Sequence, residues 1–272
     1  MKKRFVLLID FSEYSNNLIH YACDWSKQVD ADLLLMHQTH VLSPAIAHNK
    51  HKQQISHDAN KQALQKLKTL AEDLIPETIN VSFSVEETRL QYRLAQLSTT
   101  QYDNLIFVGL KEKLIFEKLF IGSMTLQVID KTEHIVVAMP KDISTFSHER
   151  IYVAVTDKHP INIDELNNFL KCIENENTII TFFYLAKPNE KTKQIENQLK
   201  ELSEAYAHRF NTSYAIYEGT RPFEDIKKVI NNTIEELLVV QRGSRLLTDK
   251  LFRKFLINDL VYEGQTPLIV LP

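Results

Sequence analysis

Gly109 and the pair Gly122-Ser123 are the residues whose types and spacing best suit a chemical role. They lie in the stretch VGLKEKLIFEKLFIGSMTL, residues 108–126, in a chain that has only five glycines. Glycine lets a backbone approach a ligand closely, and the exposed N–H groups at a helix start bind anions. The stretch indicates a phosphate-binding loop or the remnant of one, because Glu112 stands where a second loop glycine would be expected.

A second polar group, DFSEYS at residues 10–15, follows the first apolar run directly. Open α/β sheets bind ligands beyond the carboxyl ends of their strands, which places Asp10 at a ligand site. Ser12 is a suitable N-cap for the following helix. On the local sequence alone, both residues are better explained as turn and cap residues. Gly109 ends the fourth strand, beside the first in such a fold, so both signals favour one crevice.

These residues are positioned by apolar runs of strand length that alternate with segments of helical period. The first half has the runs RFVLLI, ADLLLMH, VSFSV, NLIFVG and HIVVAM. The second half has RIYVAV, TIITFFYL, TSYAIYEG, ELLVVQ and PLIVLP. Continuous Val/Ile/Leu runs separated by helices are typical of parallel strands covered on both faces. The pattern predicts an α/β fold with doubly wound sheets.

The two halves also match each other in sequence. EKLF at 117–120 precedes DKLF at 249–252 by 132 positions, and the same offset carries Met139-Pro140 onto Leu271-Pro272. We therefore predict a duplicated unit, joined by a short polar connector. The predicted boundaries are a first domain at 1–142, a linker at 143–148 and a second domain at 149–272.

Composition restricts the partners. The formal net charge is −3 with no basic stripe, so no nucleic-acid partner is expected. The apolar run after MKKR is about half a membrane span and lacks a cleavage site, so it predicts a buried strand and no membrane partner. Cys23 and Cys172 lack Cys-x-x-Cys spacing, which is typical of a reducing compartment, and we expect a cytoplasmic protein.

No catalytic or metal-binding pattern accompanies these elements. The histidines between residues 37 and 57 have no cysteine or paired carboxylate nearby, whereas a metal site needs three or four converging ligands. Neither a Gly-x-Ser-x-Gly elbow nor a His-Glu-x-x-His helix occurs. The sequence therefore predicts no metal site, no catalytic residues and no enzyme.

The stretches LLIDFSEYSNNLIHYACDWSKQVDADLLLMH, NLIFVGLKEKLIFEKLFIGSMTLQVI and HIVVAMP resemble the universal stress protein family. Its nucleotide-binding members carry Gly-x-x-Gly, nine residues, then Gly-Ser or Gly-Thr. The resemblance covers both halves, so the chain resembles a tandem member. It implies two five-stranded parallel sheets of order 3-2-1-4-5, paired through their last strands as an intrachain pseudo-dimer. Further association into a homodimer stays open.

The resemblance also implies a ligand, ATP or another adenine nucleotide, with or without Mg²⁺. Asp10 would hold the adenine-ribose side, and the backbone at Ile9 and Gln38 would line the base pocket. Gly109 would turn close to the ribose and phosphates. The phosphates would meet backbone N–H and hydroxyl groups at a helix start, from Gly122, Ser123, Met124 and Thr125.

The second half departs from this motif. Gln241 replaces Gly109, and Lys254-Phe255 replace Gly122-Ser123. A bulky phenylalanine cannot serve as an open phosphate cradle. An anion site around Gly243 is an alternative, although a polar loop explains the same residues more simply. The second half is therefore interpreted as a structural partner.

The predicted function is that of a cytoplasmic stress-response protein that binds an adenine nucleotide in its first half and acts through binding rather than turnover. One alternative is a nucleotide-free scaffold that works through protein contacts alone. Another is a slow ATPase, which would need an activated water and a metal. The sequence offers no dedicated carboxylate for Mg²⁺ besides Asp10.

Overall fold

The computed structural model describes eleven stretches of the chain. These are residues 1–39, 49–87, 89–97, 101–109, 112–113, 120–121, 123–156, 159–173, 177–218, 236–248 and 265–272. The segment FEDIKKVINN at 223–232 and the segment around Tyr262, for which the sequence pattern predicts helices, lie outside them.

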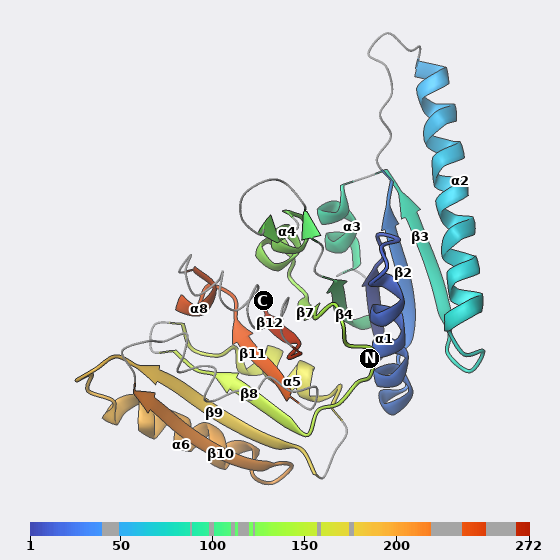
Figure 1. Cartoon of the computed structure of the whole chain (residues 1–272). Helices are drawn as coiled ribbons and strands as arrows, with labels where there is room; N and C mark the ends of the chain where they lie inside the picture. Colours follow the sequence, from blue (N-terminus) through green and yellow to red (C-terminus); the bar gives the residue numbers. More distant parts are fainter. Residues whose placement is uncertain are drawn as a thin grey trace.

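The first half begins with three strand and helix pairs (Figure 1). These are β1 (Lys2–Leu8), α1 (Ser15–Val29), β2 (Asp32–Gln38), α2 (Asn49–Leu74), β3 (Val81–Glu86) and α3 (Leu90–Leu97). It continues with β4 (Tyr102–Gly109), the short strands β5 (Glu112–Lys113) and β6 (Phe120–Ile121), α4 (Ser123–Lys131) and β7 (Ile135–Met139).

The second half repeats the alternation. Its elements are β8 (Arg150–Ala154), α5 (Ile163–Leu170), β9 (Ile179–Ala186), α6 (Lys193–Tyr206), β10 (Asn211–Glu218), β11 (Glu236–Gln241), α8 (Arg245–Thr248) and β12 (Leu268–Leu271).

Ten strands form one sheet in the order β10-β9-β8-β11-β12-β7-β4-β1-β2-β3, and β5 and β6 form a separate ribbon. The predicted α/β fold is confirmed. The five large strands of the first half lie in the order β3-β2-β1-β4-β7, which is the predicted order 3-2-1-4-5. The corresponding strands of the second half follow the same order. Two buried clusters lie on opposite faces of the sheet, one with residues from α1, α2, α5 and α6, the other with residues from α3, α4 and α8. Both faces are thus covered, which explains why the strands are continuously apolar.

The last strands of the two halves lie side by side at the centre of the sheet. β7 and β12 pair antiparallel, with Val137 opposite Ile269, whereas every other neighbouring pair in the sheet is parallel. All residues of both strands are buried. Each strand therefore covers an apolar edge that would otherwise be exposed to water and to other chains.

The connector between the halves differs from the polar surface segment that its sequence suggests. Ile143 and Phe146 are buried, and the Phe146 ring stacks on Trp25 of α1 with centroids 4.3 Å apart and planes 7° apart. Trp25 Nε1 also donates a hydrogen bond of 2.6 Å to the carbonyl of Cys172, which follows α5 in the second half. The connector is therefore part of a shared core, because two apolar residues among its six suffice to anchor it.

Arg242, directly after β11, links the halves at another point. Its Nη1 donates to the carbonyl of Thr132, which follows α4 in the first half, and its Nη2 lies 3.3 Å from the Glu133 carboxylate. A cation at the end of a helix is stabilised by the exposed carbonyls and the helix dipole. Arg242 is thus engaged between the halves rather than held ready for an anion.

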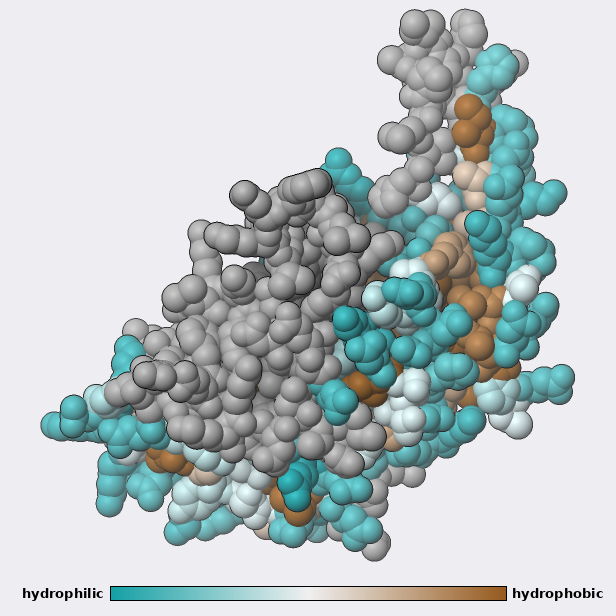
Figure 2. All heavy atoms as spheres, viewed as in Figure 1, coloured by the Kyte–Doolittle hydropathy of each residue, from teal (hydrophilic) through white to brown (hydrophobic). Residues whose placement is uncertain are grey.

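Helix α2 is long and polar, and one end of it projects beyond the sheet (Figure 1). This projecting end is mainly hydrophilic on the face that Figure 2 shows. Among the described residues, no helix combines the length and the apolar character that crossing a membrane requires.

Acidification is expected to destabilise the fold through the buried His148 and the half-buried His134. Burial lowers the pKa of His148 and of His134 below the ordinary value of about 6.5. His148 bridges the halves, with Nδ1 2.9 Å from Thr178 Oγ1 and Nε2 3.0 Å from Gln28 Oε1. Below the unfolded pKa, the unfolded chain binds more protons than the folded chain, so the free energy of unfolding decreases as pH falls.

Urea titrations between about pH 7 and pH 5.5 measure this dependence, above the range where most carboxylates titrate. His148→Gln should make the slope of unfolding free energy against pH shallower. The control His20→Gln, at an exposed position on α1, should leave it as in the parent. A parent protein that gains stability over this acid range would contradict the expectation.

Candidate functional site

The ends of β1 and β4 form the topological switch point of the first half. The strands are parallel neighbours in a register that pairs Leu8 with Val108, so Ile9 and Gly109 come next at the same edge. The helix that follows β1 covers one face of the sheet and the helix that follows β4 covers the other. The chain therefore leaves β1 and β4 toward opposite faces of the sheet, and open α/β sheets bind ligands at such a point. Asp10 follows Ile9 directly.

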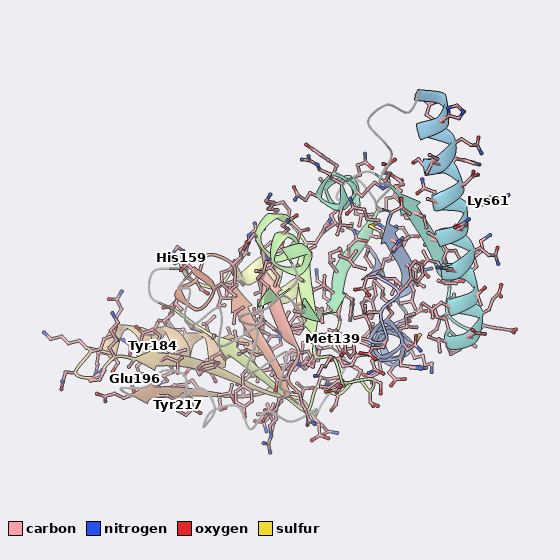
Figure 3. All side chains as sticks on the ribbon, turned by 45° about the horizontal axis from the view of Figure 1, so that its top comes forward. Lys61, Met139, His159, Tyr184, Glu196 and Tyr217 are labelled. Carbon is pink, nitrogen blue, oxygen red and sulfur yellow. The ribbon has the colours of Figure 1, made fainter. Side chains whose placement is uncertain are left out.

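Gly109 has no described neighbour that requires a glycine. A Cβ added at this position would meet nothing within 4 Å beyond its chain neighbours. Its φ is not positive, unlike that of Gly243 at +82°. Neither steric exclusion nor a left-handed backbone thus explains the residue type. Gly109 is paired with Met139 in the register of β4 and β7. Met139 lies near the middle of the molecule (Figure 3).

Asp10 holds the turn between β1 and α1. Its Oδ1 accepts hydrogen bonds from the Ser12 N–H at 2.9 Å and from the Ser15 hydroxyl at 3.3 Å. Helix α1 begins at Ser15 with Tyr14 at the N-cap and no capping side chain, so the expectation that Ser12 is the N-cap was wrong. The Asp10 carboxylate instead stabilises the turn that precedes the helix, because it accepts from both Ser12 and Ser15. These two bonds alone do not exhaust the acceptor capacity of a carboxylate.

The backbone at Ile9 is engaged within the first half. Its N–H donates to the carbonyl of Met36 at 2.9 Å, and its carbonyl accepts from Nδ1 of His37 at 2.7 Å. The imidazole therefore carries a proton on Nδ1. Gln38 ends β2, half-buried and paired in register with Glu86 of β3. A ligand at this edge would meet the second lone pair of the Ile9 carbonyl rather than its N–H.

Phe11 is a residue of this edge that the sequence did not single out. Its φ is +58°, and its ring centroid lies 4.5 Å from that of His37 and 5.9 Å from Lys66 Nζ on α2. The six letters DFSEYS give no sign of a left-handed backbone, since phenylalanine seldom adopts one. The left-handed backbone of Phe11 therefore could not be predicted from the local sequence.

The predicted phosphate end is described only in its backbone. Helix α4 begins at Ser123, with Met124 and Thr125 in its first turn, and Gly122 lies outside the described residues. Glu112 lies in β5 and pairs with Ile121 of β6. A strand conformation suits a glutamate, so this structure does not require glycine's backbone freedom at position 112. What could still disfavour a phosphate at this position is the negative charge of Glu112.

The matching edge of the second half is filled by Gln241, which stands where the first half has Gly109. Gln241 Oε1 accepts from the Asn162 N–H at 2.9 Å, and its Nε2 donates to the Pro272 carbonyl at 2.5 Å. This side chain joins the ends of β11 and β12 to the start of α5. Lys254 and Phe255 lie outside the described residues.

Metal ligands and reactive thiols are the other groups that could supply chemistry in this chain. Within the part of the chain that the structure describes, no group of three or more His, Cys, Asp or Glu side chains could hold a metal ion. His40 and His48 lie outside that part. Cys23 and Cys172 are free and buried, and burial raises the pKa of each thiol to about 11. At neutral pH both therefore stay protonated, the form with little nucleophilic reactivity.

The first half of the chain matches a known protein family in sequence. The sequence model of the Universal stress protein family matches residues 1–140, which is just over half of the chain. The chain belongs to the universal stress protein family. The matched segment contains β1 to β7 and the switch-point edge described above. This universal stress protein therefore carries its candidate site in the half that the family model matches.

Solved structures extend the similarity in fold over both halves. A universal stress protein from Archaeoglobus fulgidus DSM 4304 aligns with a TM-score of 0.68 and 16% identity, over 98% of this chain and 97% of that chain. A functionally unknown protein from Pseudomonas aeruginosa PAO1 aligns with a TM-score of 0.56 and 10% identity, over 99% and 92%. None of the curated proteins is similar enough in sequence to match.

Proposed function

We propose that this universal stress protein binds one adenine nucleotide, with ATP as the first candidate, at the switch-point edge of its first half. The observation that carries the proposal is Gly109, because its open space and ordinary backbone give no reason for a glycine among the residues that the structure describes. A ligand that approaches the backbone closely supplies that explanation. The Asp10 carboxylate and the start of α4 at Ser123 lie along the same edge, as a nucleotide's sugar and phosphates would require.

The proposed action is binding rather than turnover. Asp10 would hold the sugar side, the Ile9 carbonyl and Gln38 would face the base, and the first turn of α4 would meet the phosphates. Such a site changes the population of a conformation or the affinity for a partner through the free energy of ligand binding. We place this function in the cytoplasm, because two free, buried cysteines suit a reducing compartment.

Gly109→Ala tests this proposal. The added methyl group enters open space, so stability should be unchanged or higher by about 0.4–1 kcal/mol. If a nucleotide fills that space, affinity for ATP should fall by at least about tenfold. Thermal unfolding measures the first quantity and calorimetric titration the second.

The matched control is Gly243→Ala in the second half. Because φ at Gly243 is +82°, an alanine there is strained and should lower stability while leaving ATP affinity unchanged. A Gly109→Ala protein that binds ATP as tightly as the parent would refute the assigned role of Gly109.

A nucleotide-free scaffold is the competing function. It is favoured by the internal bonds of the edge, since the Ile9 N–H and one Asp10 oxygen already have partners within the chain. Mass spectrometry of small molecules retained by gently purified protein separates the two. A stoichiometric adenine nucleotide supports binding, and an empty protein that also fails to bind added ATP supports the scaffold. Release of phosphate at a steady rate would instead support a slow ATPase.

A further inference from the structure

The backbone of Phe11 is unusual for its residue type. Three described non-glycine residues have positive φ, namely Phe11, Asp30 and Asn189. Aspartate and asparagine tolerate the left-handed region, whereas a bulky aromatic residue there is strained. Such strain persists only where surrounding contacts maintain it, and it is frequent at ligand-binding sites.

The contacts that maintain this conformation come from the ring. It lies against the His37 ring at 4.5 Å between centroids, within 5.9 Å of the Lys66 ammonium group, and against the buried cluster beneath α1 and α2. Aromatic pairs and cations near a ring face each stabilise an arrangement modestly. Together they hold the turn between β1 and α1 in its strained form.

The same ring lies at the base end of the proposed nucleotide site. His37, on which it packs, donates to the Ile9 carbonyl and is followed by Gln38. These two backbone positions form the edge that a base would face. The Phe11 ring therefore lies beside the backbone of Ile9 and Gln38 that a base would contact. It packs on His37, the side chain that is bonded to the Ile9 carbonyl.

We propose that Phe11 is an internal stopper at the base end of the switch-point edge, and that a nucleotide base displaces the Phe11 ring from His37 on binding. The inference rests on the proposed nucleotide-binding function. Displacement is favoured over stacking on Phe11, because the ring already contacts His37 and Lys66 and a base could reach its face only by replacing one of them. Release of the left-handed turn offsets part of the lost contacts.

Calorimetric titration of the full chain with ATP tests the stopper in the parent, Phe11→Ala and Phe11→Gly. Both variants should bind ATP more tightly by roughly five- to tenfold, the factor that corresponds to one aromatic contact that no longer has to be broken. Phe11→Gly should bind no more tightly than Phe11→Ala, since glycine removes the backbone strain whose release on binding favours the bound state. Inorganic tripolyphosphate, which has no base, should bind the parent and both variants equally.

Weaker or unchanged ATP binding in the variants, with clear binding in the parent, would overturn the stopper and leave the proposed function intact. Absence of binding in all three proteins would overturn both. NMR of the parent adds a readout that does not depend on the variants' folding. The His37 ring protons, identified through His37→Gln, should lose the ring-current shift from Phe11 when ATP is added. An unchanged His37 signal in ATP-saturated protein would also overturn the stopper.

Discussion

Replacing Trp25 with alanine is expected to destabilise both halves of the chain together, by roughly 3–5 kcal/mol. The side chain is fully buried on α1, and its ring contacts rings from the first half, the connector and the second half. These rings are Phe5, Tyr21, Phe107, Phe146 and Phe169. The substitution leaves a large cavity at the junction and removes the donor to the Cys172 carbonyl. Neither half can compensate alone, because the contacts belong to both.

Denaturant unfolding monitored by circular dichroism measures this effect. Trp25→Phe should cost less than Trp25→Ala, since it keeps much of the ring packing and loses chiefly the buried hydrogen bond, on the order of 1–3 kcal/mol. Tyr92→Ala, at a side chain that is 63% exposed, is the control and should stay within about 0.5 kcal/mol of the parent. A Trp25→Ala protein in which one half unfolds early while the other keeps its parental stability would contradict a shared core.

Gly122→Arg is expected to abolish nucleotide binding, with a loss of more than about a hundredfold in affinity. The sequence places Gly122 directly before the N-terminus of α4 at Ser123, where phosphates would approach the exposed backbone N–H groups. A long side chain at this position fills the space that the phosphates need. Stability should change little by comparison if the role of the position is to admit a ligand.

Calorimetry of the same proteins also gives the stoichiometry. We expect at most one nucleotide per chain, because Gln241 occupies the edge of the second half with bonds to Asn162 and Pro272. Lys254→Arg, 132 positions after Gly122, is the matched control and should leave ATP affinity unchanged. Two equivalent sites per chain would refute this assignment.

Much of the secondary structure could be predicted because it depends on local periodicity. The segment SNNLIHYACDWSKQV forms α1, since its apolar positions repeat with the helical period. The runs NLIFV and IVVAM became buried central strands, since only a sheet covered on both faces accepts continuous apolar runs. The convergence of Asp10 and Gly109 on one edge followed from the strand order alone.

The candidate site was predictable in its location and only partly in its chemistry. Residue spacing indicated the edge near Gly109 and the helix start at Ser123. It did not indicate that Asp10 rather than Ser12 holds the turn before α1, because several polar residues of DFSEYS suit a turn equally. Nor did it indicate the strand pairing of Glu112, which depends on a partner nine residues further along.

The sequence by itself determined the alternation of strands and helices, the duplicated pattern and the family. Only the tertiary structure decided which side chains connect the halves and which occupy the strand ends. Trp25 and Cys172 are 147 positions apart, and Gln241 meets Asn162 across 79. The left-handed turn at Phe11 is maintained by Lys66 and His37 from other elements. Such contacts leave no periodic trace in the chain, because they depend on how covered sheets and helices pack rather than on which element each residue forms.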